Sequence, residues 1–256
     1  MNQQTRTLVL VAAVLFVGVS TQNSAWAGTG SWPFALGDRP LTLSGGMIEL
    51  RGDTLRINLS DGAAGDPISL APDLFYGVNN KLTVGLTHEI GICLNNDCGY
   101  NDFGFEAIYG LAKMSGFAIA AQGGLIFPST DPFGTGIRLG LVTRLSASKL
   151  SVVIEPKLYI GFVGRSDVRK EVLDIPVEIQ YQAIPKATVQ VFTGLTNGTF
   201  DGFGDNAQIP LGIGATYVVI RRFDVGADFV FTNVLGPQDG KLDGRTFVLR
   251  AALRMF

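Results

Sequence analysis

The chain has 256 residues, a formal net charge of −2, 46% hydrophobic residues and 16% charged residues. This charge balance gives no reason to expect nucleic acid as a partner, because nucleic-acid-binding surfaces carry an excess of basic residues. Beyond the N-terminal segment, no run of about 18 or more apolar residues occurs, which argues against a helical membrane protein. Apolar residues at alternate positions of membrane-spanning strands would account for the high hydrophobic content.

The first 27 residues have the pattern of an export signal that is removed by cleavage. Arg6 supplies a positive charge, an apolar run extends over residues 8–19, and Ala25 and Ala27 form the small-x-small site of a signal peptidase. The apolar run is too short for a stable membrane anchor. We therefore expect the exported chain to begin at Gly28.

Segments of about 9 to 14 residues with a period of two follow, as tilted membrane-spanning strands require. The pattern predicts twelve strands, near residues 48–59, 68–78, 81–90, 103–111, 116–127, 135–145, 150–163, 172–182, 187–196, 209–220, 223–235 and 246–256. In the first strand, the alternation of apolar residues shifts by one position between Leu50 and Leu55. This slip predicts either a bulge near residues 51–53 or a strand that starts only at Thr54.

Tight turns alternate with longer loops rich in Gly, Asp, Asn and Pro. The tight turns are expected near residues 79–80, 112–115, 146–149, 183–186 and 221–222. In outer-membrane barrels the short turns face the periplasm and the longer loops face outside, so both ends of the chain are expected on the periplasmic side. Aromatic residues near predicted strand ends, such as Tyr76 and Phe127, are typical of interfacial girdles.

The clearest strands separate charged from apolar residues. Ile137, Leu139 and Leu141 share one face of their strand, and Arg138 and Arg144 share the other. A basic residue that faces lipid near the bilayer midplane costs about 2–4 kcal/mol, so the charged face is expected to line the lumen. The predicted pore-lining residues are Arg56, Asp73, Glu106, Arg138, Arg144, Glu155, Lys157, Asp174, Glu178, Asp224, Asp228 and Arg250.

With this export signal, these strands and the terminal aromatic Phe256, the sequence resembles Gram-negative outer-membrane β-barrels of the small porin-like kind. The resemblance covers essentially all of residues 28–256. It implies an all-β, closed, antiparallel transmembrane barrel of about 12 strands in the bacterial outer membrane, surrounded by its lipid. Residues 1–27 would be the signal peptide, 28–46 a periplasmic N-terminal segment and 47–256 the barrel. One departure is that the apolar face of the last strand ends at Met255, which leaves Phe256 out of phase.

The predicted lumen allows two interpretations. A water-filled pore with acidic and basic walls would pass small hydrophilic solutes by passive diffusion and would need no cofactor. Alternatively, the charges could pair inside a non-conducting barrel that anchors a trans-envelope complex. Barrels of about 8 strands are filled by side chains and those of 16 to 18 strands are open. A barrel of twelve strands has an intermediate width, which does not distinguish the pore from the non-conducting barrel. Inward glycines, such as Gly85, Gly136 and Gly214, favour open space and hence the channel.

Residues 28–46 form the segment before the first strand and include Trp32, Pro33, Phe34 and Leu36. This segment could bind a periplasmic partner, or could fold into the mouth of the barrel as a partial gate. It could also be a disordered tail, since chain ends are poorly ordered unless they are tied down. The sequence leaves the three alternatives open.

Cys93 and Cys98 are the only cysteines, and an even count in an exported protein predicts a disulfide in this outer loop. His88 is the only histidine, so no metal site is expected. In phase with Leu86, it is predicted on the lipid side, where some lipid-cleaving barrel enzymes carry a catalytic histidine. The chain has no G-x-S-x-G motif, and Ile90 stands where a serine would be needed, so an enzyme is not expected.

Overall fold

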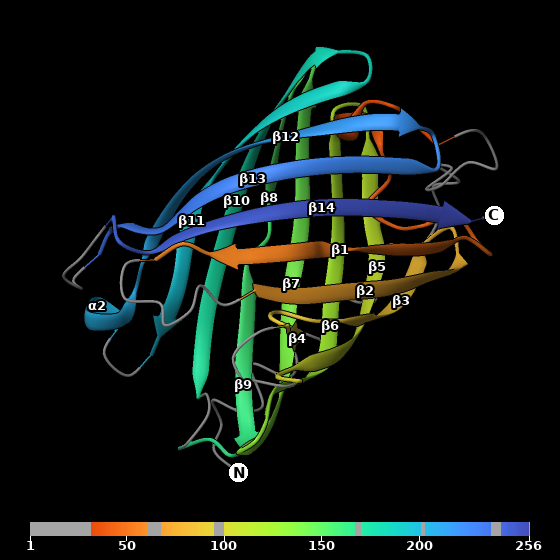
Figure 1. Ribbon diagram of the computed structural model, residues 1–256. Helices are drawn as coiled ribbons and strands as arrows, with labels where there is room; N and C mark the ends of the chain where they lie inside the picture. Colours follow the sequence, from red (N-terminus) through yellow and green to blue (C-terminus); the bar gives the residue numbers. More distant parts are fainter. Residues whose placement is uncertain are drawn as a thin grey trace.

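The computed structural model describes residues 32–60, 68–94, 100–166, 170–200, 203–236 and 242–255. These residues form a closed antiparallel β-barrel, as the predicted alternation required (Figure 1). None of the helices among them is long and apolar enough to cross a membrane. The predicted signal peptide and Phe256 lie outside the described residues.

The twelve predicted strands are confirmed, with boundaries that differ by a few residues. The strands are β1 (Ile48–Asn58), β2 (Ile68–Asn79), β3 (Leu82–Thr87), β4 (Ile92–Cys93), β5 (Phe103–Met114), β6 (Phe117–Thr130), β7 (Phe133–Ala147), β8 (Leu150–Ile154), β9 (Lys157–Val163), β10 (Glu171–Ile184), β11 (Ala187–Thr199), β12 (Ile209–Ile220), β13 (Phe223–Leu235) and β14 (Arg245–Met255). β8 and β9 are two parts of one barrel strand, since both pair with β7 and β10, and the short β4 pairs with β2 beyond the end of β3. β1 pairs with both β2 and β14, which closes the barrel.

The predicted bulge in the first strand is confirmed. The register of β1 shifts between Gly52 and Leu55 against β14, and between Asp53 and Arg56 against β2. A Cβ atom at Gly52 would lie 2.2 Å from the carbonyl oxygen of Ala71, so the close approach of the two strands requires glycine here. The strand already starts at Ile48, which excludes the later start at Thr54.

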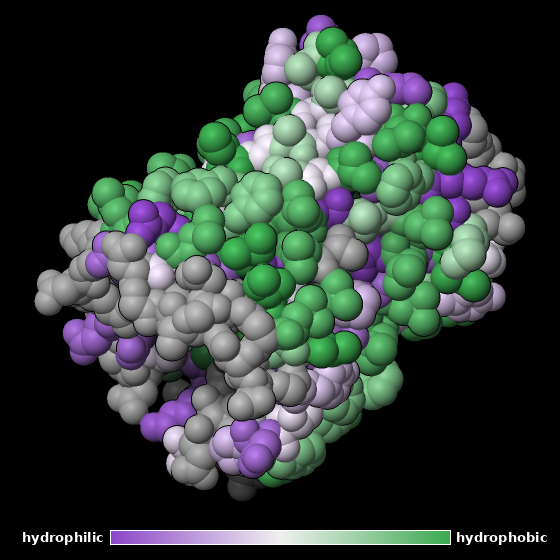
Figure 2. Space-filling view, in the orientation of Figure 1, coloured by the Kyte–Doolittle hydropathy of each residue, from purple (hydrophilic) through white to green (hydrophobic). Residues whose placement is uncertain are grey.

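The outer surface of the barrel is apolar. Leu139 and Ile213 are 53% and 63% exposed, whereas Val248, which faces inward, is 6% exposed. Figure 2 shows hydrophobic side chains over the strands, with hydrophilic ones mainly toward the ends of the barrel. This distribution suits a hydrocarbon surrounding, because lipid-facing and lumen-facing residues alternate along each strand.

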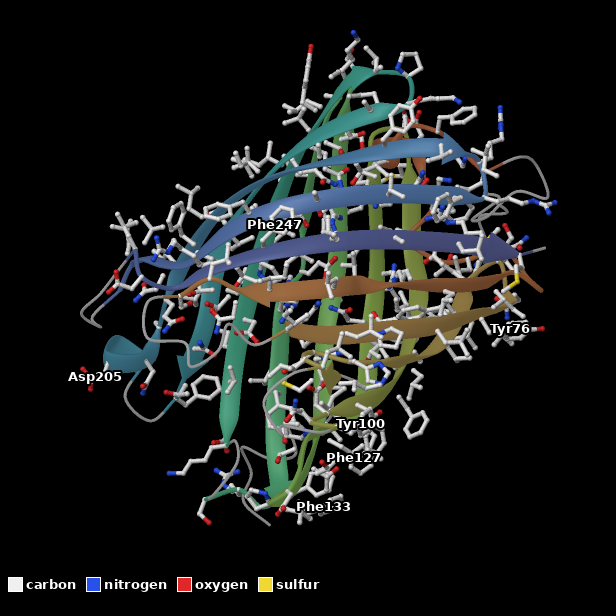
Figure 3. All side chains as sticks on the ribbon, viewed as in Figure 1. Tyr76, Tyr100, Phe127, Phe133, Asp205 and Phe247 are labelled. Carbon is white, nitrogen blue, oxygen red and sulfur yellow. The ribbon has the colours of Figure 1, made fainter. Side chains whose placement is uncertain are left out.

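Aromatic side chains gather toward both ends of the barrel (Figure 3). At the loop end, Tyr100 stacks on Phe103, Phe103 on Phe127, and Phe127 contacts Phe133, with ring centroids 6.0, 4.4 and 5.9 Å apart. Tyr76 lies near the opposite end, where short turns join the strands. Two such belts are typical of the two interfaces of a membrane.

The N-terminal segment lies inside the barrel, not beside it. Residues 32–46, which we call the plug, enter the mouth at the end of the short turns and form the 3-10 turn η1 (Leu36–Asp38). Trp32, Leu43 and the adjacent Met47 are buried there against inward-facing residues of the wall. These wall residues are Phe75, Ile108, Ala120, Val142 and Val153. Of the three alternatives for this segment, the contacts fit the one in which it fills the mouth.

Candidate functional site: the barrel lumen and its plug

Hydrogen bonds tie the middle of the plug to the turn end of the barrel wall. The Leu43 amide donates to Thr83 Oγ1 of β3 over 2.7 Å, and Ser146 Oγ of β7 donates to the carbonyl oxygen of Gly37 over 3.1 Å. Thr42 Oγ1 donates to the carbonyl oxygen of Asn80 over 2.9 Å. Because the plug is not part of the sheet, the bond to Thr83 supplies the buried amide of Leu43 with the partner that it would otherwise lack.

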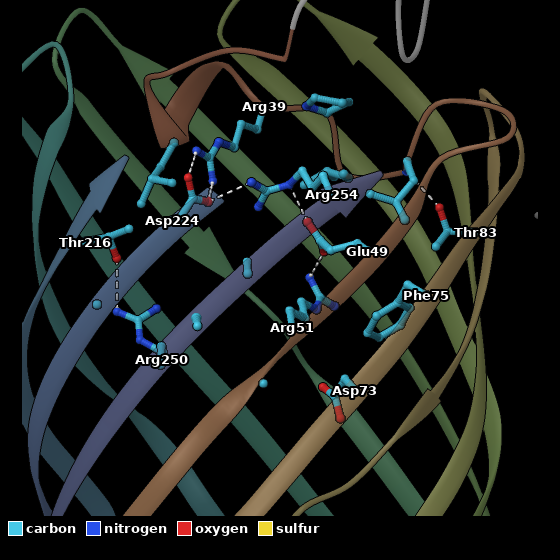
Figure 4. Close-up of a pocket in the computed structure, with 18 of the residues that line it drawn as sticks. Arg39, Glu49, Arg51, Asp73, Phe75, Thr83, Thr216, Asp224, Arg250 and Arg254 are labelled. Atoms are coloured by element: carbon cyan, nitrogen blue, oxygen red, sulfur yellow. Dashed lines mark hydrogen bonds and ion pairs between the residues drawn. The ribbon is translucent and has the colours of Figure 1, made fainter. Parts of the chain in front are cut away.

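A charged network, which we call the latch, joins the plug to β13, β14 and β1 (Figure 4). Arg39 of the plug contacts both carboxylate oxygens of Asp224, at 2.6 and 2.9 Å. Arg254 bridges Asp224 at 2.8 Å and Glu49 at 2.5 Å, and each of these four side chains is at most 8% exposed. Arg51 reaches Glu49 from the wider lumen, at 3.5 Å.

Burial lowers the pKa of the Arg39 guanidinium, and its hydrogen bonds and charge interaction with Asp224 act in the opposite direction. A buried charge is tolerated when an opposite charge and well-placed hydrogen bonds compensate its lost hydration. The latch meets this condition through two arginines that share one aspartate. Asp224 is therefore the residue through which the latch holds Arg39, and with it the plug, against the wall.

Cations also hold the aromatic end of the plug. The guanidinium carbon of Arg221 lies 4.6 Å from the ring centroid of Phe34, and Lys186 Nζ lies 5.4 Å from it. Arg254 lies 5.0 Å above the ring of Trp32, whose carbonyl oxygen accepts a hydrogen bond from Arg221. Cation–π contacts of this kind contribute about 0.5–2 kcal/mol, more where the site is desolvated.

Three adjoining cavities of about 430, 490 and 490 Å³ occupy the lumen. The first borders the plug and shares Asp73, Arg144 and Glu155 with the second, and the second and third share Arg56 and Lys157. All twelve residues that the sequence predicted as inward-facing charges line one or more of these cavities.

The charged walls are largely paired. Arg138 reaches Glu106 at 3.2 Å and Glu89 at 3.4 Å, across β7, β5 and the segment after β3. Lys157 pairs with Glu155 at 2.8 Å. Acids and bases thus alternate around the lumen, so its surface carries ion pairs and not one continuous charge of a single sign.

Arg250 organises the wall formed by β11 to β14. Its Nε lies 2.6 Å from Asp228 Oδ2, and its Nη2 donates to Gln190 Oε1 over 2.6 Å and to Thr216 Oγ1 over 3.3 Å. The same group lies over the Phe192 ring at 5.8 Å. This side chain is therefore fixed in position, with one face toward the first and third cavities.

The expectation that inward glycines leave open space is wrong at several positions. A Cβ atom at Gly214 would lie 1.8 Å from Asp228 Oδ1, one at Gly85 would lie 2.4 Å from the Phe75 ring, and one at Gly136 would lie 2.6 Å from Tyr159. Large neighbouring side chains thus fold over these glycines. The glycines accommodate the packing of the wall and do not by themselves widen the lumen.

The lipid-facing position predicted for His88 is also wrong. β3 ends at Thr87, and the chain bends before β4, so the alternation of β3 does not extend to residue 88. His88 lines the first two cavities, with Nδ1 3.7 Å from Asp73 Oδ1 and Nε2 2.9 Å from the Tyr100 hydroxyl. This position does not favour a lipid-cleaving reaction at the barrel surface.

Sequence reasoning missed five charged residues of the lumen. They are Arg39, Glu49, Arg51, Glu89 and Arg254. Arg254 could have been found, because it lies on the same face of its strand as Arg250, and Glu49 pairs with it across β1 and β14. Arg39 gave no such signal, since it belongs to a segment without strand periodicity. Cys93 is disulfide-bonded, and Cys98 lies outside the described residues, so their pairing stays a prediction.

The sequence matches no protein family model and no curated protein. Among solved structures, it is similar to the KdgM porin, with a TM-score of 0.54 and 13% identity over 82% of this chain and 99% of that one. It is similar to the NanC porin with a TM-score of 0.55 and 13% identity, over 81% of this chain and 98% of that one. It is also similar to an outer membrane channel from Pseudomonas putida F1, with a TM-score of 0.56 and 11% identity over 93% of this chain and 100% of that one. The predicted fold, a small closed antiparallel β-barrel similar to these outer-membrane porins, is therefore confirmed.

Proposed function

We propose that this protein is a channel of the bacterial outer membrane, through which small hydrophilic solutes diffuse passively. The observation that carries the proposal is the set of three adjoining lumenal cavities, lined by charged side chains of both signs. An apolar outer surface and two aromatic belts support the membrane location. The end with the short turns would face the periplasm.

The paired walls favour small polar or zwitterionic solutes. Ion pairs such as Arg138 with Glu106 and Lys157 with Glu155 offer donors and acceptors on neighbouring strands, which can replace part of a solute's hydration. A matching structure of the KdgM porin is described as a complex with disordered oligogalacturonate, which supports a polar solute in a lumen of this fold. Paired charges, however, would bind no single ionic class strongly.

The plug would act as the gate of this channel. It fills the turn-end mouth with buried apolar side chains and is held there by the latch. Conduction would require these side chains to move, while the barrel wall stays intact. The same observation favours a second candidate, a non-conducting barrel that the plug closes permanently and that anchors other components of the envelope.

Single-channel recording in a planar bilayer, with refolded residues 28–256, tests the proposal. We expect discrete current steps from the wild type. Arg138→Ala would leave Glu106 and Glu89 without their arginine and would increase cation selectivity, measured as a shift in reversal potential under a salt gradient. Arg165→Ala, which removes an arginine paired with Glu171 at the loop end, is the matched control and should leave selectivity nearly unchanged. Silence from folded wild type and from variants with a released plug would favour the non-conducting barrel.

A further inference from the structure

The two ends of the barrel carry opposite charge. The turns at residues 80–81, 115–116, 148–149, 185–186 and 221–222 contain five basic residues and no acidic residue. Among the residues that the structure describes, the connections at the other end contain five acidic residues and two basic ones, namely Glu89, Asp102, Asp131, Asp205 and Asp243 against Arg165 and Lys170. An uneven distribution of this size creates a potential along the barrel axis, positive at the turn end.

The basic residues at the turn end surround the mouth. We call them the collar: Lys81, Lys113, Lys149, Lys186, Arg221 and Arg222. Lys186 and Arg221 contact Phe34 of the plug, which places both at the inner side of the rim. The others lie at strand ends or in the turns beside them.

Backbone pairing with the neighbouring strands places two more collar residues at the mouth. Lys81 lies two residues before Thr83, whose buried hydroxyl accepts a hydrogen bond from the plug. Arg222 lies two residues before Asp224 of the latch. Both residues lie in the turns just before β3 and β13, and each pairs with an inward-facing residue of the neighbouring strand. The carbonyl oxygen of Lys81 accepts a hydrogen bond from the amide of Gly110, and that of Arg222 accepts one from the amide of Arg254. Four collar residues, Lys81, Lys186, Arg221 and Arg222, are thus placed at the rim of the mouth, where a ligand would approach.

Acidic residues are few in the plug and in the turns of the collar. Residues 32–46 contain one acid, Asp38, and one base, Arg39. Deeper in the mouth, Asp224 and Glu49 are already shared by Arg39 and Arg254. Clustered lysine and arginine side chains are effective partners for carboxylate and phosphate groups, which they bind through charge-assisted hydrogen bonds.

We propose that the collar is a binding site for multivalent anions at the turn-end mouth, and that a bound anion competes with Phe34 for Lys186 and Arg221. Phe34 offers these cations only the face of a ring, whereas an anion offers full negative charge. Binding would therefore loosen the aromatic end of the plug. This inference goes beyond the proposed function, because it requires only the plug and the collar and not a conducting lumen.

Trp32 provides a direct readout, since it is the only tryptophan of residues 28–256 and is 6% exposed beside Phe34. Tripolyphosphate, added to the refolded protein in neutral detergent, should shift Trp32 emission to longer wavelength and increase quenching by acrylamide. Sodium chloride at matched ionic strength should leave the emission unchanged. It screens charges but does not bind Lys186 and Arg221 in place of the Phe34 ring. Citrate, a carboxylate probe, should act like tripolyphosphate.

A variant with Lys81→Gln, Lys149→Gln and Arg222→Gln neutralises three collar charges and keeps Lys186 and Arg221, the two cations that contact Phe34. Its midpoint for tripolyphosphate should rise about tenfold, the effect expected when three exposed charge interactions are lost. The control Arg165→Gln with Lys170→Gln neutralises two bases at the loop end and should titrate like wild type. Heat-modifiable mobility in gels confirms that each variant is folded.

Three results would overturn the inference: no change in Trp32 emission, an equal change with sodium chloride, or an unaltered midpoint in the collar variant. Because the measurement is made in detergent without current, its outcome is separable from that of the conductance experiment. A barrel that binds anions but never conducts would contradict the channel and leave the collar site standing. A conducting barrel without the fluorescence change would contradict the collar site and support the channel.

Discussion

Arg39 and Asp224 are 185 residues apart in the sequence, yet they form a two-pronged ion pair with oxygen–nitrogen distances of 2.6 and 2.9 Å. This pair connects a segment without strand structure to the inner face of β13. Arg254 binds the same carboxylate from β14, so the plug completes a network that the barrel wall alone leaves half-formed. The position of the plug therefore depends on the folded barrel, and its release need not unfold the barrel.

We first predict that Arg39→Gln loosens the plug without unfolding the barrel. Asp224 keeps Arg254 as a partner, so the loss is that of one charged hydrogen-bonded pair, about 2 kcal/mol of plug binding. Trp32 emission should move to longer wavelength, and channel activity should rise. Arg165→Gln, which breaks an ion pair with Glu171 at the opposite end, serves as control. Unchanged emission and current in Arg39→Gln would show that the latch does not hold the plug.

A second prediction is that a disulfide can lock the plug. A Cβ atom at Gly37 would lie 3.2 Å from Cβ of Ser151, so a small outward shift of the plug brings the pair into the range of about 3.5–4.5 Å found in disulfides. Gly37→Cys with Ser151→Cys, in a background that lacks Cys93 and Cys98, should cross-link on oxidation. Oxidised protein should conduct less than the same sample after reduction.

Each single cysteine variant controls for the substitutions themselves in this experiment. Their currents should not respond to reductant. If the oxidised double variant conducts as well as the reduced one, with the cross-link verified by mass, the plug is not the gate. The proposed channel could still stand, with a path that bypasses residues 32–46.

Most of the barrel could be predicted from the sequence, because alternation has a direct physical cause. A charged residue on the lipid face is costly, so Arg138 and Asp228 had to point inward, and the strand limits followed from the same period of two. The bulge near Gly52 was visible as a change of phase for the same reason. These features depend on each residue's own strand and need no knowledge of its neighbours.

The plug and the use of the glycines could not be predicted in this way. Arg39 has no strand pattern, and its partner Asp224 is identified only when the barrel has closed. Gly214 appeared to leave space because a single strand does not show that Asp228 of the next strand folds over it. His88 was placed on the wrong face because the end of β3 at Thr87 has no proline or charge pattern to mark it. The position of the plug and the packing around the glycines depend on contacts between residues that are distant in the sequence.

A third prediction concerns Gly214. Its substitution by alanine would place Cβ 1.8 Å from Asp228 Oδ1, so the carboxylate must move away from Arg250, to which it is bound at 2.6 Å. We expect a loss of about 1–3 kcal/mol in the free energy of unfolding, measured by urea titration in lipid vesicles. Gly123→Ala is the control, because its nearest neighbour, Leu139 Cδ2, is 3.3 Å away and flexible. Equal stability of the two variants would refute this account of the inward glycines.

The fourth prediction concerns Asp102, which replaces regular sheet pairing where the barrel wall bends between β3 and β4. Its buried carboxylate accepts hydrogen bonds from the amides of Glu89, Ile90 and Gly91, at 2.5, 2.8 and 3.1 Å. Asp102→Ala would leave three amides of this bend without their acceptor, at a cost of about 1–3 kcal/mol for each amide that water does not reach.

We expect the damage to be local, since the strand pairs of β3 with β2 and β5 do not include Asp102. Hydrogen exchange should accelerate at residues 89–91 and stay slow in β12 and β13. Asp102→Asn, which keeps one acceptor oxygen, should give an intermediate effect, and Asp131→Ala in the short connection between β6 and β7 should give none at residues 89–91. Equal acceleration of exchange around the whole barrel would contradict the prediction of local damage. It would mean that Asp102 stabilises the closed sheet as a whole.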